Sequence, residues 1–260
     1  MSYNKIKVTS DGDVAIIALS DPTTMNACSL EMAGELGEAL KAAAVGPEAK
    51  RAVVITGEGR GFCSGANLQT APRGGVPDAG AALEAVLNPM ITAIRDLPIP
   101  VVTAVNGAAA GIGCSIGLMG DLIVCGEGGY FLQAFRRLGL VPDGGSTYIL
   151  PRMIGKARAM EMVLLGEKIL SAQALEWGLV NRVVPDSDLM PTALGLARQL
   201  AAGPMSLGWI RQAVWASLDS NWSEQLHHER EAQRRAGLTE DFREGVAAFQ
   251  EKRTPAFKGR

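Results

Sequence analysis

The sequence contains few of the residues that signal a metal centre, a disulfide framework or a nucleic-acid surface. It has two histidines and four cysteines, and the cysteines show no C-x-x-C spacing and have no histidine close by. The cysteines are Cys28, Cys63, Cys114 and Cys125. This spacing argues against a zinc site and favours free thiols packed as small apolar side chains. The formal net charge of −2 provides no excess of basic residues, so we expect no nucleic-acid partner.

Segments that would direct the chain to or through a membrane are also missing from the pattern. The start, MSYNKIKVTS, has no apolar run behind a basic end, so we predict no signal peptide and a cytoplasmic location. Residues 99–120 are uncharged and apolar, but Pro100, Asn106 and several glycines interrupt them. We therefore expect a buried strand, a loop and a short helix there, and no membrane span.

The first half of the chain alternates between strand-like and helix-like segments. Two strands are predicted around a turn at Asp11 and Gly12, and further strands are predicted at residues 51–57, 101–105 and 121–126. One helix is predicted after a Ser29 N-cap, and a second over residues 83–94, where Pro89 should produce a kink. The buried face of the first helix is predicted to hold Leu30, Ala33, Leu36 and Leu40. This alternation predicts parallel strands and an α/β fold.

Beyond Lys156 the strand pattern nearly stops, leaving LVNRVV, and amphipathic helical segments follow. We predict a core domain over residues 1–195 and a helical region over residues 196–260 that covers the core or mediates assembly. A Gly/Pro-rich stretch at residues 71–80 is either a mobile lid or an ordinary surface loop.

Residues 106–121, NGAAAGIGCSIGLMGD, raise several functional hypotheses because they hold five glycines in a short run. A G-x-S-x-G pattern surrounds Ser115, but a loop separates it from the preceding strand, whereas a hydrolase elbow serine follows its strand directly. His227 and His228, the available bases, lie in a charged segment typical of a solvated helix. The glycine spacing, G-x-G-x-x-x-G, also departs from the dinucleotide fingerprint. Hydrolase and dinucleotide-binding functions are therefore disfavoured.

Two glycine-rich loops, residues 59–68 and 106–113, each follow a strand that contains Val-Val. Backbone N–H groups at the carboxyl ends of such strands, beside helix starts, converge where negative charge is stabilised. One donor from each loop would form an oxyanion hole, in which small residues let a ligand approach the main chain. The pattern alone leaves open that these glycines form tight turns and nothing more.

At these loops the chain resembles the crotonase (enoyl-CoA hydratase/isomerase) superfamily. Matching blocks follow the family's order over nearly the whole length: MNACSLEM, GRGFCSGANL, VVTAVNGAAAGIG, LGLVPDGGSTYILPR, LSAQALEWGLVNRVV and EGVAAFQEKRTPAFKGR. The resemblance implies a spiral of ββα units with a helical C-terminal region, assembled as a homotrimer or a dimer of trimers. It implies an acyl-CoA thioester substrate, with coenzyme A as part of that substrate and no separate cofactor or metal.

The resemblance also implies roles for individual residues. The backbone N–H groups of Ala66 and Ile112 would hold the thioester carbonyl, and Ile112, where glycine is commoner, would narrow the pocket. The segment bordering the adenine and pantetheine would comprise Ser64, Ala66, Asn67, Leu68 and Gln69. Many members have lysine where this chain has Gln69, which puts one phosphate contact in doubt. Phe249 and Lys252 would reach the coenzyme A of a neighbouring subunit.

The positions of the two glutamates that bind water in family hydratases correspond here to Ser115 and Phe135. Neither residue ionises usefully, so hydration lacks its base and acid. Asp143 remains, at a position where the isomerase branch carries an acid, including enoyl-CoA Δ3,Δ2-isomerases and the ring-1,2-epoxyphenylacetyl-CoA isomerase type. One acid suffices to move a proton from C2 to C4.

We therefore predict an enoyl-CoA isomerase with Asp143 as its acid and base. Its pKa should be raised because Leu140, Val141 and a bound acyl chain would desolvate the carboxylate. Three alternatives stay open from the sequence. Asp143 could instead form a turn and cap the helix near Ser146, the enzyme could be a hydratase that uses other groups or water, or the protein could bind acyl-CoA without catalysis.

Overall fold

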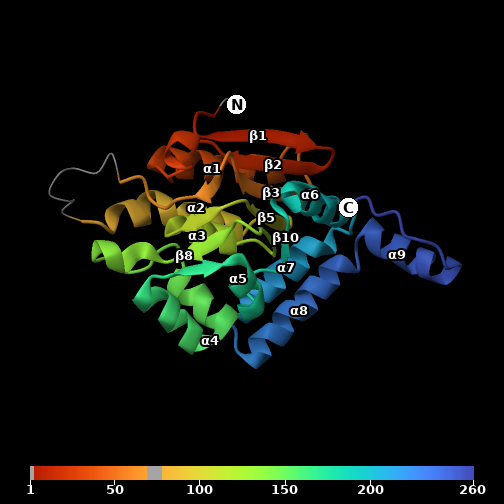
Figure 1. The fold of residues 1–260 in the computed structure, drawn as a ribbon. Helices are drawn as coiled ribbons and strands as arrows, with labels where there is room; N and C mark the ends of the chain where they lie inside the picture. Colours follow the sequence, from red (N-terminus) through yellow and green to blue (C-terminus); the bar gives the residue numbers. More distant parts are fainter. Residues whose placement is uncertain (1–2, 69–77) are drawn as a thin grey trace.

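The computed structural model describes residues 3–68 and 78–260, and two sheets lie at its centre (Figure 1). Within these residues the larger sheet has the strand order β1-β2-β3-β5-β7-β10, in which the pair β1·β2 is antiparallel and the others are parallel. Its strands are β1 (Ile6–Asp11), β2 (Val14–Leu19), β3 (Ala52–Gly57), β5 (Val101–Val105), β7 (Leu122–Gly126) and β10 (Arg182–Val184).

The smaller sheet has the order β4-β6-β8-β9, with β4, β6 and β8 parallel and β9 antiparallel. Its strands are β4 (Gly61–Cys63), β6 (Ala108–Ala110), β8 (Tyr130–Leu132) and β9 (Lys168–Leu170). Along the chain, β3, β5 and β7 of the larger sheet are each followed by a strand of the smaller sheet and then by helical structure. This repeated path is the predicted ββα spiral.

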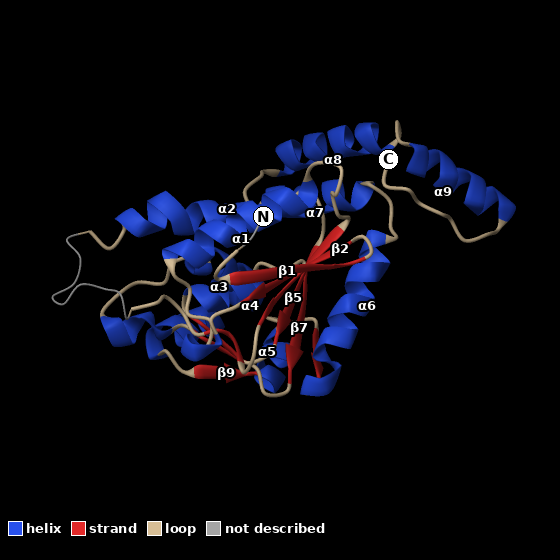
Figure 2. Cartoon of the chain, turned by 90° about the horizontal axis from the view of Figure 1, so that it is seen from above, coloured by secondary structure: helices blue, strands red, loops and turns tan. Residues whose placement is uncertain are grey.

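Helices cover both sheets. The helices of the first part are α1 (Leu30–Ala44), α2 (Asn88–Arg95), α3 (Ile112–Leu118), α4 (Ser146–Leu165) and α5 (Ser171–Trp177). Those of the second part are α6 (Leu189–Ala201), α7 (Ser206–Ser217), α8 (Trp222–Ala236) and α9 (Glu240–Glu251). Helix α6 packs on one face of the larger sheet, where Ala193 and Ala197 contact its valines (Figure 2). It runs across the predicted boundary at residues 195 and 196.

Several local predictions are confirmed. Gly12 has a positive φ of 57° in the turn between β1 and β2. Ser29 caps α1, since its hydroxyl oxygen accepts the N–H of Met32 over 3.1 Å. All four cysteines are free and buried. No helix within residues 3–68 and 78–260 is long and apolar enough to cross a bilayer.

Other predictions need correction. Leu30 is 51% exposed, because it is the first residue of α1 and its side chain lies off the buried stripe. The strands of the smaller sheet have three residues each, which is too short for a hydrophobic period, and β9 lies in the part predicted as nearly all helical. The distortion expected at Pro89 takes the form of a π-helical segment, Leu83–Leu87. Pro89 itself lies in the first turn of α2, where its missing N–H has no intrahelical partner to lose.

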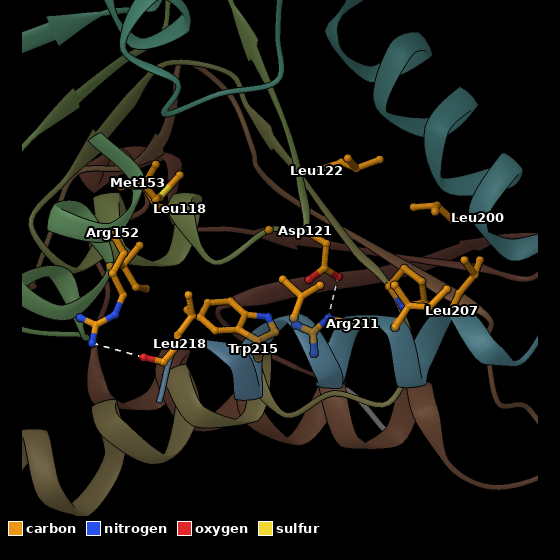
Figure 3. A pocket seen from close by; sticks show the side chains of 15 residues that line it. Leu118, Asp121, Leu122, Arg152, Met153, Leu200, Leu207, Arg211, Trp215 and Leu218 are labelled. Carbon is orange, nitrogen blue, oxygen red and sulfur yellow. Dashed lines mark hydrogen bonds and ion pairs between the residues drawn. The ribbon is translucent and has the colours of Figure 1, made fainter. Parts of the chain in front are cut away.

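A buried ion pair holds α7 against the core. Arg211, with a side chain 3% exposed, donates to Asp121 at the start of β7 over 2.6 Å. It also donates to backbone carbonyls at the end of α2, including that of Ile94 over 2.6 Å. Asp121 in turn accepts the N–H of Val101 over 2.7 Å. Figure 3 shows this pair at the base of an apolar cavity of about 420 Å³ between α4, α6 and α7. The pair thus ties α7 to α2, β5 and β7.

Candidate active site

Three parallel strands of the smaller sheet end at the same edge and deliver three loops there. Strand β4 leads into Ser64–Gly65–Ala66, β6 leads into Gly111–Ile112, and β8 leads into Gln133 and the 3-10 helix Ala134–Leu138. The carboxyl ends of parallel strands are where α/β proteins gather ligand-binding loops. The predicted site therefore follows β4 and β6, and not the Val-Val strands β3 and β5 directly.

The two predicted oxyanion loops touch each other through glycines. Gly65 has a φ of 110° and Gly111 a φ of 51°, conformations that L side chains rarely adopt. A Cβ atom built on Gly111 would lie 3.8 Å from the Cα of Gly65, and one built on Gly65 would lie 3.3 Å from the carbonyl oxygen of Ala110. Each glycine immediately precedes one predicted donor, so this contact brings Ala66 and Ile112 together.

Both predicted donor groups are left unused by the fold. Cys28 forms a parallel bridge with Ala66: its N–H donates to Gly65 over 2.7 Å, and its carbonyl accepts from Asn67 over 3.0 Å. In such a bridge the N–H of Ala66 itself points away from Cys28. Ile112 is the first residue of α3, where an N–H has no intrahelical acceptor. In the described part of the chain neither N–H has a backbone acceptor.

Asp143 lies next to the start of α3. A Cβ built on Gly144, the following residue, would lie 2.6 Å from Cδ1 of Ile112 and 2.8 Å from Oγ of Ser115. Gly144, with a φ of 58°, therefore packs directly on the helix. Asp143 Oδ1 is buried and has no hydrogen-bond partner among the described residues. The carboxyl of Asp143 is thus held near the two donors without being neutralised by a cation.

Burial raises the pKa of Asp143 to about 6, as the sequence predicts. The predicted cause is wrong in part, because Leu140 is 47% and Val141 78% exposed. Their backbone lies in an open loop, so their side chains do not cover the carboxyl. The contacts on Gly144 place Ile112 and Ser115 beside this loop instead. Burial, then Cys63, then Asp143 raise the pKa of the Cys28 thiol, which keeps that thiol neutral near the carboxyl.

The positions of the two hydratase glutamates have other tasks here. Ser115, 1% exposed, lies inside α3, and its hydroxyl donates to the backbone carbonyl of Asp143 over 3.1 Å. Phe135 is buried, and its ring atom Cζ lies 3.6 Å from a Cβ position built on Gly111. The burial of Ser115 inside a helix also argues against a hydrolase elbow, and His227 and His228 lie in α8, away from this site.

The remaining predicted site residues fall into three groups. The hydroxyl of Ser64 donates to the carbonyl of Thr24 over 2.8 Å, and Leu68 is 51% exposed at the end of the first loop. Gln69 lies outside the described residues. Phe249, 86% exposed, and Lys252, at the end of α9, lie at the opposite end of the chain from α3 (Figure 1). Their contact with coenzyme A stays a prediction.

Sequence reasoning missed three side chains that support the site. Asn26, fully buried, donates to the carbonyls of Glu58 and Gly61 and accepts the N–H of Asp21. It thereby fixes the segment that carries Cys28. Gln133 and Ser146 form a buried hydrogen bond of 3.0 Å beside Ser115. These are single polar residues inside apolar or turn segments, so no spacing rule marks them.

Two cavities bear on the site. One of about 340 Å³ reaches from Gly145, two residues after Asp143, past Met119 and Ile91 to Tyr148 and Asp219. The cavity of Figure 3 is lined by none of the three predicted catalytic residues. Within residues 3–68 and 78–260, no cluster of three or more His, Cys, Asp or Glu side chains is placed to hold a metal ion.

Comparisons with known proteins agree with this geometry. A family model described as enoyl-CoA hydratase/isomerase matches residues 9–260. A 1,2-epoxyphenylacetyl-CoA isomerase of Escherichia coli (strain K12) is 42% identical over 251 residues, covering 95% of each chain. A carnitinyl-CoA dehydratase of Salmonella typhi is 35% identical over 265 residues, covering 98% of each. The crystal structure of an enoyl-CoA hydratase from Polaromonas sp. JS666 is 39% identical with a TM-score of 0.91, covering 97% of this chain and 99% of that one.

Proposed function

The chain belongs to the enoyl-CoA hydratase/isomerase (crotonase) family, and within that family we propose that it is an enoyl-CoA isomerase. The crotonase fold and the status of an acyl-CoA enzyme follow from the family. The proposal concerns the reaction: a 1,3-proton shift carried out by Asp143 on a thioester whose carbonyl oxygen is bound by Ala66 and Ile112.

One observation carries the proposal. Asp143 is a desolvated carboxyl beside two unused backbone donors, while Ser115 and Phe135 occupy the positions of the hydratase glutamates. Adding water across a double bond needs one group to activate water and another to protonate carbon. A proton shift needs a single group that first accepts and then donates. A pKa of about 6 suits both roles near neutral pH.

The proposed steps balance in protons and charge. The Asp143 carboxylate removes a proton from C2 of a 3-enoyl thioester, and the electron pair moves toward the carbonyl oxygen. The N–H groups of Ala66 and Ile112 stabilise the resulting dienolate oxygen. Asp143, now protonated, returns the proton to C4, so the double bond moves from C3–C4 to C2–C3. The enzyme ends in its starting state.

The cavity beyond Asp143 supports an acyl group of limited size with a polar far end. Ile91, Met119 and Ile149 supply apolar walls. At the far end the hydroxyl of Tyr148 donates to Asp219 over 2.8 Å. A relative is named 1,2-epoxyphenylacetyl-CoA isomerase, so ring-bearing acyl groups belong in the substrate screen beside short linear 3-enoyl groups.

Asp143→Asn tests the proposal because asparagine keeps the shape of aspartate and cannot act as a base. With a short 3-enoyl-CoA, formation of the conjugated product is followed by its ultraviolet absorbance. We expect turnover to fall by roughly a hundredfold to ten-thousandfold with acyl-CoA binding retained. Asp186→Asn, whose carboxylate accepts the N–H of Gly128 over 3.0 Å, is the matched control and should keep its activity.

Two outcomes would replace the proposal. Wild-type isomerase rates in Asp143→Asn would remove Asp143 from the mechanism. A wild-type protein that binds acyl-CoA tightly and turns over no 3-enoyl thioester would point to a binding protein, whereas water addition to a 2-enoyl thioester would point to a hydratase.

A further inference from the structure

A chain of buried hydrogen bonds runs from the end of β8 to the loop that carries Asp143. Nε2 of Gln133 donates to Oγ of Ser146 over 3.0 Å. Oγ of Ser146 lies 2.7 Å from Oγ of Ser115, and the Ser115 hydroxyl donates to the backbone carbonyl of Asp143 over 3.1 Å. Gln133 is 0%, Ser115 1% and Ser146 3% exposed. The chain therefore lies out of reach of solvent.

Counting protons fixes the direction of this chain. A backbone carbonyl accepts and never donates, so the single proton of Ser115 is committed to Asp143. The short contact between the two serines must then use the proton of Ser146, and Ser146 in turn accepts from Gln133. The opposite amide orientation of Gln133 would draw the Ser146 proton away, require the Ser115 proton for Ser146, and leave the carbonyl of Asp143 without its donor. Every link therefore depends on the link before it.

The same helix carries both the anchor and the oxyanion donor. Ile112 begins α3, and Ser115 is three residues later on the same helical face. Gly144 fits between them because it has no side chain, as the 2.6 Å and 2.8 Å approaches of a built Cβ to Ile112 and Ser115 demonstrate. One turn of helix thus sets the separation between the Ile112 N–H and the loop of Asp143.

We propose that Ser115, supported by Ser146 and Gln133, is a positioning residue that holds Asp143 at a fixed place relative to the oxyanion donor Ile112. This inference rests on the proposed isomerase function. A serine suits the role because it is neutral. A carboxylate at the same place would repel the charge of Asp143. Displacement of a reacting group by about 1 Å can cost on the order of a hundredfold in rate.

Ser115→Ala tests the proposal by removing the anchor from the centre of the chain. We expect kcat on a 3-enoyl-CoA to fall about tenfold to a hundredfold while KM changes by less than about threefold. A released loop also exposes the carboxyl to water. The pKa of Asp143, measured by carbon-13 NMR titration, should then move from about 6 toward its ordinary value of about 4, and the acid limb of the pH–rate profile should follow.

Two further variants sharpen the test. Ser146→Ala removes the second link and should lose less activity than Ser115→Ala, and the double variant should be no worse than Ser115→Ala alone. Ser171→Ala is the matched control. Its buried hydroxyl also donates to a backbone carbonyl, that of Glu127, over 2.8 Å at the start of α5. It should change neither kcat nor the pKa of Asp143.

The outcomes separate this inference from the proposed function. An unchanged kcat and an unchanged Asp143 pKa in Ser115→Ala would overturn it, as would an equal loss in Ser171→Ala. The NMR titration needs no substrate, so it decides the positioning role even if the wild-type protein isomerises nothing. Ser146→Ala gives the same decision if Ser115→Ala fails to fold, as checked by circular dichroism.

Discussion

Asp143→Asn should stabilise the unliganded protein at neutral pH, although it abolishes the proposed chemistry. The pKa of Asp143 is raised by burial to about 6 in the folded protein, whereas an unfolded chain gives about 3.9. Between these values the native state binds more protons than the unfolded state. Stability therefore falls as the pH rises through this window, and the full penalty is present above pH 6. Asparagine carries no charge and escapes that penalty.

The size of the effect follows from the pKa difference. About two pKa units correspond to at most about 3 kcal/mol. The side chain of Asp143 is partly exposed, so solvent screening reduces the expected gain to about 1–2 kcal/mol. For a chain of this size, that gain corresponds to a rise in melting temperature of about 2–8 °C.

Thermal unfolding of both proteins from pH 4 to pH 8, at equal concentration and without acyl-CoA, measures the effect. Asparagine and a protonated carboxyl can differ by a constant amount, so the informative quantity is the change with pH. The melting temperature of Asp143→Asn relative to wild type should rise between about pH 4 and pH 7 and then level off. A difference that is constant over this range, or one that shrinks with rising pH, would refute a desolvated carboxylate at residue 143.

Three further predictions concern the oxyanion hole, the buried ion pair and assembly. Ala66→Pro removes one proposed donor N–H and should lower turnover by on the order of a hundredfold or more, with secondary structure retained by circular dichroism; near-normal turnover would exclude this loop. Arg211→Met leaves Asp121 buried without its cation and should cost about 3–5 kcal/mol in urea unfolding. Arg198→Met, at an exposed pair with Asp11, should cost less than about 1 kcal/mol, and equal costs would contradict the argument. Light scattering should report a trimer or a dimer of trimers, and a monomer at micromolar concentration would refute that state.

The sequence predicted the parts of the fold that have a clear period or a specific turn residue. The hairpin at Gly12, the cap at Ser29 and the apolar strand at 101–105 are all in place. Their signals are local, because each depends on a few neighbouring residues. The smaller sheet escaped prediction since strands such as β4 and β6 have three residues and pair with partners distant in the chain.

The candidate site was predicted in outline and not in its support. The resemblance indicated Ala66, Ile112 and Asp143, and the structure brings the loops that carry them together. The tie between Ser115 and Asp143 spans 28 positions of sequence, so no local pattern encodes it. The raised pKa was predicted from the wrong neighbours for a similar reason: apolar residues adjacent in sequence, Leu140 and Val141, point away from the carboxyl.

The contact between the glycines at 65 and 111 divides the site into positions with different freedom to change. The proposed donors are main-chain atoms, so the side chains of Ala66 and Ile112 can be exchanged without removing an N–H group, proline excepted. The glycines before them have positive φ and close backbone neighbours, so almost any side chain there would separate the loops. A directed-evolution library at residues 66 and 112, with both glycines kept, would therefore explore new acyl groups on an unchanged anion-binding frame.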